Sequence, residues 1–348
     1  MKGNEALAAA AVRAGCRFYF GYPITPQTEL AAYMSKKMPK IGGTFLQAES
    51  ELAAINMVYG ASSAGARAMT SSSSPGISLK GEGVSYMAGA DLPGVIINVE
   101  RGGPGLGSIQ PSQQDYWQAT RALGHGDFRM IVYAPSTVQE MADYVYLAFD
   151  KADEYRMPVM LLADGLLGQM MEPVVLPPEK KNLPDKPWAT DGHKGKRSHN
   201  IINSLCLQAD ELERMLIERY KRYDRIEATE QQSEGFMLDD AEYVIVAFGA
   251  SARIARSAVV QARAEGIKAG LLRPITLWPF PNDAIKQTIE HAKAYLSVEM
   301  NMGQMIDDIR LAVNGQRPVD FYGRSGGMIP TPEGTLDALK ALVQKVGE

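Results

Sequence analysis

Cysteine and histidine are scarce in this chain. Its 348 residues include two cysteines, Cys16 and Cys206, and four histidines. Two cysteines are too few to ligate an iron–sulfur cluster or to build a Cys-rich zinc site, and we expect both to be small buried or half-buried apolar side chains. Only His193 and His199 lie close together, in a Lys/Gly/Ser-rich loop that we expect to be solvated. Any redox chemistry of this protein therefore needs an electron carrier on another chain.

The chain also lacks a basic excess and a long apolar run. Its net charge is −4 and its pI is near 5.7, which argues against nucleic acid as a partner. No apolar segment approaches the roughly 20 residues that span a bilayer, and the segment 1–5 lacks the apolar core of a signal peptide. We therefore expect a cytoplasmic protein with no membrane contact, long enough for two or three domains.

Residues 1–175 alternate short apolar runs with helical patterns. The segments 18–20, 66–70, 94–99, 130–133 and 158–162 have the composition of strands. Strands that alternate with helices predict an α/β domain in which helices cover both faces of a mostly parallel sheet.

The composition changes in the segment 176–238. Lysine and arginine there are interleaved with proline, glycine and aspartate, and a polar helix is predicted over 209–226. We interpret the segment as a linker or crossover arm with one helix. Its charges predict a solvated face, with a subunit contact as the alternative.

Residues 239–348 predict a second α/β unit. An apolar strand from Tyr243 enters a Gly/Ser turn at 249–251, and further helix and strand patterns follow to Glu299. The turn does not carry the full glycine fingerprint of a dinucleotide site, so a structural turn is favoured there.

A proline-rich hook follows the first strand. Gly21–Pro26 reads Gly-Tyr-Pro-Ile-Thr-Pro, and a helical pattern starts at once over 28–34. The two prolines fix φ and push Tyr22 and Thr25 towards extended backbone, so the hook is stiff. It lies at the carboxyl end of a strand, where open α/β sheets bind ligands; a rigid turn without chemistry is the alternative.

Two acids and two small-residue segments follow. Glu49 and Glu51 lie just ahead of, or within, the first turn of an Ala-rich helix, where compensation of the helix dipole alone would favour acids. The segments 61–65 and 70–76 are rich in serine and glycine. We interpret them as loops that either approach a ligand closely or are simply flexible.

An arginine follows the buried strand 94–99. Arg101 enters a loop with four glycines over 102–107, which we expect to leave its guanidinium unobstructed. A planar guanidinium suits bidentate capture of a carboxylate, although a surface arginine on a loop is the alternative.

These segments together resemble the α subunit of thiamine-diphosphate-dependent 2-oxoacid:ferredoxin oxidoreductases. The motifs that carry the resemblance are Tyr22–Pro26, Glu51, the Ser-Ser-Pro-Gly sequence at 73–76, Leu92–Gly94 and Arg101–Pro104. It covers nearly the whole chain and implies a pyrimidine-binding domain followed by a domain like the C-terminal domain of transketolase.

Three further segments resemble the branched-chain (2-oxoisovalerate) members more than the 2-oxoglutarate members. They are Gly107–Gln113, Gly124–Asp127 and Arg324–Pro332. The resemblance therefore implies oxidative decarboxylation of a branched-chain 2-oxoacid with coenzyme A, which gives acyl-CoA, CO2 and reduced ferredoxin. Members acting on 2-oxoglutarate or an aryl-pyruvate remain alternatives, as does a non-catalytic homologue that binds a small acid or serves as an assembly scaffold.

The resemblance also implies roles for single residues. Glu51 matches the glutamate that hydrogen-bonds the aminopyrimidine ring and favours its imino tautomer, with Glu49 as the rival. Thr25 and Arg101 match residues that hold the 2-oxoacid, Arg101 through the carboxylate and Thr25 near the carbonyl. Tyr22 and Pro23 would lie against the cofactor.

Two motifs of the complete enzyme are missing. The sequence has no Gly-Asp-Gly followed by an Asn pair, the arrangement that holds Mg2+ and the diphosphate in thiamine enzymes, and it has no CxxC motif. The resemblance therefore implies that a β subunit carries the diphosphate and Mg2+, and that other chains carry [4Fe–4S] clusters. These would be a γ-type subunit and a two-cluster, ferredoxin-like δ subunit.

Overall fold

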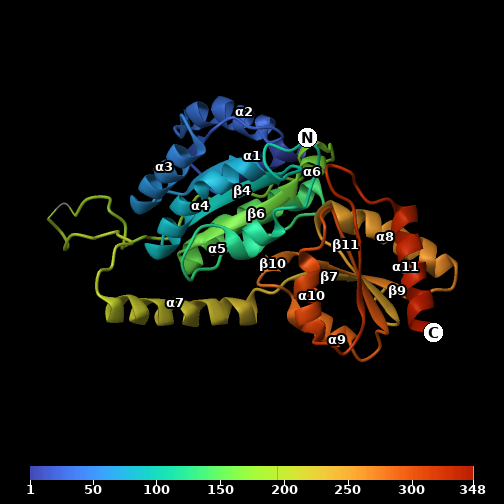
Figure 1. Cartoon of the computed structure of the whole chain (residues 1–348). Coiled ribbons are helices and arrows are strands. Elements are labelled where there is room, and N and C mark those ends of the chain that lie inside the picture. The colour runs from blue at the N-terminus through green and yellow to red at the C-terminus, as the bar shows by residue number, and fades with distance from the viewer. Residues whose placement is uncertain (194, 348) are drawn as a thin grey trace.

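The computed structural model describes residues 1–193 and 195–347 and contains two parallel-type sheets with helices around them (Figure 1). The first sheet has the strand order β10-β5-β6-β4-β3-β1-β2. Its strands are β1 (Phe18–Gly21), β2 (Thr44–Gln47), β3 (Ala68–Ser72), β4 (Gly94–Glu100), β5 (Ile131–Tyr133), β6 (Pro158–Asp164) and β10 (Thr276–Trp278). All its pairs are parallel except β10 with β5.

Helices follow the strands of this first unit as the alternating pattern predicted. They are α1 (Gly3–Arg13), α2 (Thr28–Lys37), the 3-10 turn η1 (Met38–Ile41), α3 (Glu51–Ser63), α4 (Ser74–Gly89), the π-helical turn η2 (Gln118–Ala122), α5 (Val138–Tyr155) and α6 (Gly165–Gln169). Strands β4 and β6 are buried along their whole length, as expected for central strands covered on both faces.

The second sheet has the order β12-β11-β8-β9-β7. Its strands are β7 (Ser233–Phe236), β8 (Tyr243–Val246), β9 (Ala269–Pro274), β11 (Ala294–Glu299) and β12 (Val319–Gly323). Its helices are α8 (Gly249–Ala264), α9 (Asn282–Thr288), α10 (Met305–Val313) and α11 (Pro332–Gly347). The α/β class predicted for both units is confirmed.

Two strands cross the domain boundaries expected from the sequence. β7 lies in the segment interpreted as a linker, yet it pairs antiparallel with β9 in the second sheet. β10 lies within the second unit of the sequence, yet it forms the edge of the first sheet beside β5. Local composition cannot predict either pairing. Which sheet each strand joins depends on the sheet edge that it reaches in the folded chain.

The arm between the units leaves the body of the molecule and returns through α7 (Ala209–Thr229), which runs along the first unit (Figure 1). The predicted helix is confirmed there, and the described residues of the segment 172–208, which exclude residue 194, have little regular structure. Among the described residues, no helix combines the length and the hydropathy needed to cross a membrane.

The two units share a packed apolar interface. Tyr116 of the first unit lies with its ring centroid 5.7 Å from that of Phe248 of the second, and both side chains are buried. Gln113 joins the units through its side chain, which donates to the Phe248 carbonyl (2.8 Å) and accepts from the Ser251 hydroxyl (2.7 Å) and the Met300 amide (3.0 Å). Because this interface is buried and hydrogen-bonded, the sheets hold a fixed relation to each other.

Candidate active site

Hydrogen bonds with buried residues anchor one end of the hook, while its other residues are exposed to solvent. Thr25, Tyr22 and Pro23 are exposed, whereas the Pro26 carbonyl accepts a hydrogen bond of 2.8 Å from the buried Asn4 side chain. Gln27, also buried, accepts a 2.6 Å bond from the Ser71 hydroxyl of β3. The hook is therefore tied to α1 and to the centre of the sheet, and it presents its three predicted site residues outwards.

Glu51 and Glu49 lie in different environments. Glu51 is the first residue of α3, whose N-cap Ser50 accepts a 3.1 Å bond from the Ala53 amide. Its side chain is 6% exposed, whereas Glu49 is exposed. Within residues 1–193 and 195–347 the Glu51 carboxyl accepts no hydrogen bond. A buried carboxyl without a partner is poised to bind a polar group.

Small residues at the end of β3 and the start of α4, Ser72 and Gly76, lie beside the Glu51 carboxyl. We call this group the cradle. A Cβ placed on Gly76 would lie 2.1 Å from the Ser72 Oγ and 2.5 Å from the Glu51 Oε1, so any side chain at this point of α4 would displace one or both of these groups. The hydroxyls of Ser72 and Ser73 are buried and have no hydrogen-bond partner among the described residues. The Glu51 carboxyl and the Ser72 hydroxyl therefore meet beside Gly76, at the carboxyl end of β3.

The sequence interpretation of 70–76 as a loop is wrong. β3 continues to Ser72, and α4 begins at Ser74 with Pro75 in its first turn. Proline at the first helical positions costs no hydrogen bond, because the amide would be unpaired there in any case. The small side chains serve close packing of strand, helix and α3, not flexibility.

Lys80 is a site residue that the sequence reasoning missed. It is fully buried in α4, and its Nζ lies 3.3 Å from the Glu51 carbonyl oxygen. Burial lowers its pKa to about 8, and the Glu51 charge opposes that effect. Gly76 and Lys80 are four residues apart and so share one face of α4. That spacing is the signal that could have found it, once 74–89 was recognised as a helix.

Arg101 connects the end of β4 to the hook. Its Nη1 donates to the Thr25 carbonyl (3.1 Å) and its Nη2 to the Leu106 carbonyl (3.2 Å). The residue is 7% exposed, so the expectation of an unobstructed guanidinium is wrong for this chain alone. The glycine-rich loop folds back, and its Leu106 carbonyl accepts a hydrogen bond from the Arg101 guanidinium. Its buried Nε has no hydrogen-bond partner in the described part of the chain.

Three buried carboxyl groups, those of Glu100, Asp115 and Asp164, were not predicted from the sequence as part of the site. Glu100 accepts a 2.8 Å bond from the Asp115 amide, and Asp164 accepts from the amides of Leu166 and Leu167 at the start of α6. Burial, followed by the charges of Asp115 and Asp164, raises the pKa of Glu100 well above its usual range. Burial raises the pKa of Asp164 to about 6. Removal from water raises the pKa of these carboxyls because it disfavours their charged forms.

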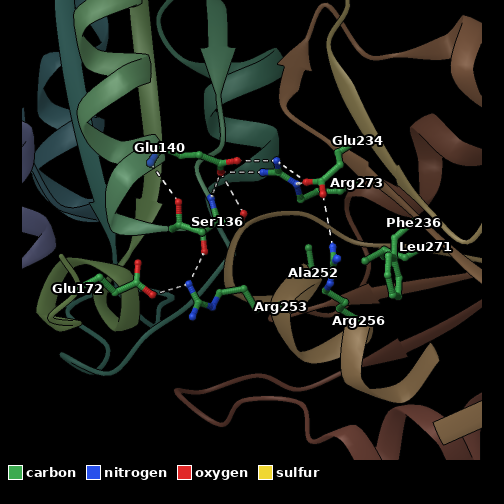
Figure 2. Close-up of a pocket in the computed structure, with 11 residues that line it drawn as sticks. Ser136, Glu140, Glu172, Glu234, Phe236, Ala252, Arg253, Arg256, Leu271 and Arg273 are labelled. Carbon is green, nitrogen blue, oxygen red and sulfur yellow. Dashed lines mark hydrogen bonds and ion pairs between the residues drawn. The ribbon is translucent and has the colours of Figure 1, made fainter. Parts of the chain in front are cut away.

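The cavity drawn in Figure 2 lies elsewhere, between the two units, and measures about 500 Å3. Arginine and glutamate side chains line it, and Arg273 lies between Glu140 (2.7 Å) and Glu234 (2.8 Å). Arg253 pairs with Glu172 at 2.9 Å. None of the predicted site residues lines this cavity. The pairs Arg273–Glu140 and Arg253–Glu172 join the two units across it.

The cysteines and histidines lie outside the site. Cys16 is buried and Cys206 is half-buried, and both are free, as expected. His193 and His199 are exposed, with ring centroids 4.2 Å apart. In the part of the chain that the structure describes, no group of three or more His, Cys, Asp or Glu side chains is arranged to hold a metal ion.

Two family models match the chain. One, described as pyruvate flavodoxin/ferredoxin oxidoreductase, thiamine diphosphate-binding, matches residues 9–233. The other, pyruvate:ferredoxin oxidoreductase core domain II, matches residues 241–335. The match boundaries fall near the change from the first unit and arm to the second unit.

Curated relatives cover the whole chain. Ketoisovalerate oxidoreductase subunit VorB of Methanothermobacter thermautotrophicus is 50% identical over 100% of this chain and 97% of its own length. The 2-oxoglutarate synthase subunit KorA of Archaeoglobus fulgidus is 37% identical over 93% of this chain and 94% of its own.

Solved structures share the fold. A 2-oxoglutarate:ferredoxin oxidoreductase from Magnetococcus marinus, with 2-oxoglutarate, coenzyme A and succinyl-CoA bound, superposes with a TM-score of 0.85 at 26% identity. The match covers 99% of this chain and 65% of that one. A split-gene transketolase shares the fold at a TM-score of 0.64 and 16% identity. The chain therefore belongs to the family of thiamine-diphosphate-dependent pyruvate and 2-oxoacid ferredoxin oxidoreductases, as its motifs predicted.

Proposed function

We propose that this chain supplies the aminopyrimidine-binding half of the active site in a branched-chain 2-oxoacid:ferredoxin oxidoreductase. The complex would convert 2-oxoisovalerate, coenzyme A and oxidised ferredoxin to the acyl-CoA, CO2 and reduced ferredoxin, the electron pair leaving through iron–sulfur clusters. The observation that carries the proposal is the buried Glu51, whose carboxyl accepts no hydrogen bond from the described residues and lies beside Gly76 and the Ser72 hydroxyl.

The hydrogen-bonding groups of this cradle suit an aminopyrimidine ring. A ring of that kind carries nitrogen atoms that need hydrogen-bond partners, and the cradle offers the Glu51 carboxyl and the Ser72 hydroxyl, which has no partner among the described residues. Thiamine diphosphate, when bound, supplies the electron sink for decarboxylation. Glu51 would hold a proton at a ring nitrogen, and Tyr22 and Pro23 of the exposed hook would form a wall of the site.

Arg101 and Thr25 would hold the 2-oxoacid. The Arg101 guanidinium is already bound to the hook through the Thr25 carbonyl, while its second terminal nitrogen bonds only a loop carbonyl. A substrate carboxylate would replace that carbonyl, since a charged acceptor forms the stronger bond. The Thr25 hydroxyl, on the exposed side of the hook, would bond near the reacting carbonyl.

The remaining parts would come from partner chains. The relatives named above are themselves subunits, and this sequence lacks a Gly-Asp-Gly motif and a CxxC motif. We assign the diphosphate and Mg2+ to a β subunit. The [4Fe–4S] clusters and part of the coenzyme A site fall to a γ-type subunit and a ferredoxin-like δ subunit.

A reconstitution experiment tests this function. The purified chain alone and the complex with its partners are assayed for 2-oxoacid-dependent ferredoxin reduction with 2-oxoisovalerate, 2-oxoglutarate and an aryl-pyruvate. We expect no turnover by the chain alone and the highest kcat/KM for 2-oxoisovalerate in the complex. Turnover by the isolated chain would refute the shared site, and a preference for 2-oxoglutarate would reassign the substrate.

A further inference from the structure

Lys80 is an unusual residue to find inside a cradle of small side chains. Its side chain is 0% exposed, and a lysine is rarely buried without a charged partner in contact. In residues 1–193 and 195–347 its Nζ makes one hydrogen bond, to the Glu51 carbonyl at 3.3 Å, and no direct ion pair. An ammonium that has lost its water for a single neutral acceptor is costly to keep, which indicates a role beyond packing.

The arrangement directs the positive charge of Lys80 at Glu51. Lys80 lies one helical turn after Gly76, and the space left by Gly76 is where the Glu51 Oε1 lies. The carbonyl that Lys80 binds belongs to Glu51 itself, at the first position of α3. The same lysine thus holds the backbone of the residue and acts on its carboxyl through space.

No other described charge competes for this lysine. Burial lowers the pKa of Lys80 and Glu51 is the one charged group that raises it. The strands packed against α3 contribute Tyr19, whose hydroxyl is bonded to Ser71 in the sheet, and Glu100 at the end of β4, which is buried and accepts from the Asp115 amide. The other charged residue of α4, Glu82, is exposed and bonded to Tyr86. Lys80 and Glu51 therefore form an electrostatic pair, while the buried carboxyls of Glu100 and Asp115 lie nearer the first turn of α4.

We propose that Lys80 is a positioning residue that fixes the first turn of α3 and biases the proton shared by Glu51 and the cofactor towards the ring nitrogen. The inference rests on the proposed function, since it assumes that Glu51 meets the aminopyrimidine. A nearby ammonium stabilises the carboxylate over the carboxylic acid, so the proton is placed on the ring. Lys80 would touch neither cofactor nor substrate and would act through Glu51.

The test separates the charge of Lys80 from its hydrogen bond. Lys80→Gln keeps a donor for the Glu51 carbonyl and removes the charge, Lys80→Met removes both, and Lys80→Arg keeps the charge. Lys186→Met is the matched control, because the side chain of Lys186, in the arm, is also largely buried and pairs with Asp153 of α5 at 2.5 Å. Each variant is assembled with its partner subunits and loaded with thiamine diphosphate. The pH profile of kcat/KM and the exchange of the cofactor C2 proton are then measured.

We expect the acid limb of the profile to move to higher pH by about one unit or more in Lys80→Gln and Lys80→Met. C2 exchange near neutral pH should slow in parallel. Lys80→Arg should restore much of the wild-type limb, and Lys186→Met should leave it in place. An unchanged limb in an assembled Lys80→Gln complex would overturn the proposal, as would failure of both neutral variants to assemble, because the charge would then serve folding.

The variant Glu51→Gln separates this inference from the proposed function. If Glu51→Gln abolishes C2 exchange while Lys80→Gln behaves as wild type, only the role of Lys80 fails. If Glu51→Gln leaves exchange unchanged, the proposed role of Glu51 fails first.

Discussion

The substitution Gly76→Ala tests the cradle with a single methyl group. The added Cβ would lie 2.1 Å from the Ser72 Oγ and 2.5 Å from the Glu51 Oε1. Both distances are far shorter than a carbon–oxygen contact, so the serine hydroxyl must rotate and the Glu51 carboxyl must retreat. The backbone of α3 is held by its N-cap and by Lys80, and the movement therefore falls on the side chain of Glu51.

Two opposing effects set the change in stability. Alanine within a helix is favoured over glycine by about 1 kcal/mol, whereas an extra methyl group in a packed region costs about 1–3 kcal/mol. The free energy of unfolding should therefore fall by no more than about 2 kcal/mol. The catalytic effect should be larger, because a displacement of about 1 Å at a reacting group can cost roughly 10²-fold in rate.

The assay compares kcat of the assembled complex with thermal unfolding of the chain. We expect kcat to fall by roughly 10²-fold while the complex still assembles. Gly60→Ala is the control for helix propensity, because Gly60 is a helical glycine of α3 and the methyl group that alanine adds there would have no atom within 4 Å. This control should stabilise the chain by up to about 1 kcal/mol. Wild-type activity in Gly76→Ala would refute the proposal that the cradle positions the Glu51 carboxyl for catalysis.

Three further substitutions test other parts of the account. Gln113→Ala removes three buried hydrogen bonds between the units and should lower the free energy of unfolding by about 2–4 kcal/mol; a change below about 0.5 kcal/mol in urea unfolding would contradict it. Arg101→Lys cannot keep both carbonyl bonds of the guanidinium, so the KM for the 2-oxoacid should rise more than kcat falls, and an unchanged KM would contradict the substrate role. Asp164 has a raised pKa of about 6, against 3.8 for the ordinary group. The folded state therefore binds the Asp164 proton more tightly than the unfolded state does. The stability that this proton contributes is lost as pH rises through about 4 to 6. Asp164→Asn should reduce that loss, measured by urea unfolding at several pH values, and an unaltered pH dependence would assign it to other carboxyls.

Much of the fold follows from local sequence patterns. The segments at 94–99 and 158–162 are short and mostly apolar, and they form buried central strands. The stiff Pro-Ile-Thr-Pro hook and the helix after it are equally local, since proline fixes the backbone on its own. Glu51 could be separated from Glu49 by helical spacing, and burial agrees with that choice.

Features that depend on long-range packing could not be predicted. A run of serine, glycine and proline at 71–76 favours a loop by composition, and it becomes a strand end and a helix only because α3 packs against it. In the sequence, Lys80 is indistinguishable from an ordinary surface lysine. Its burial becomes evident only from the packing of α4. The exchange of β7 and β10 between sheets depends on open edges that no local pattern shows.

The most direct test of the central claim compares Glu51→Gln with Glu49→Gln in the assembled complex. Each variant removes one carboxylate from the same short segment of the sequence, but only Glu51 is buried at the cradle. The measurement is exchange of the cofactor C2 proton. We predict that Glu51→Gln slows exchange by roughly 10²–10⁴-fold and that Glu49→Gln exchanges as wild type. Slow exchange in Glu49→Gln with wild-type exchange in Glu51→Gln would contradict the account.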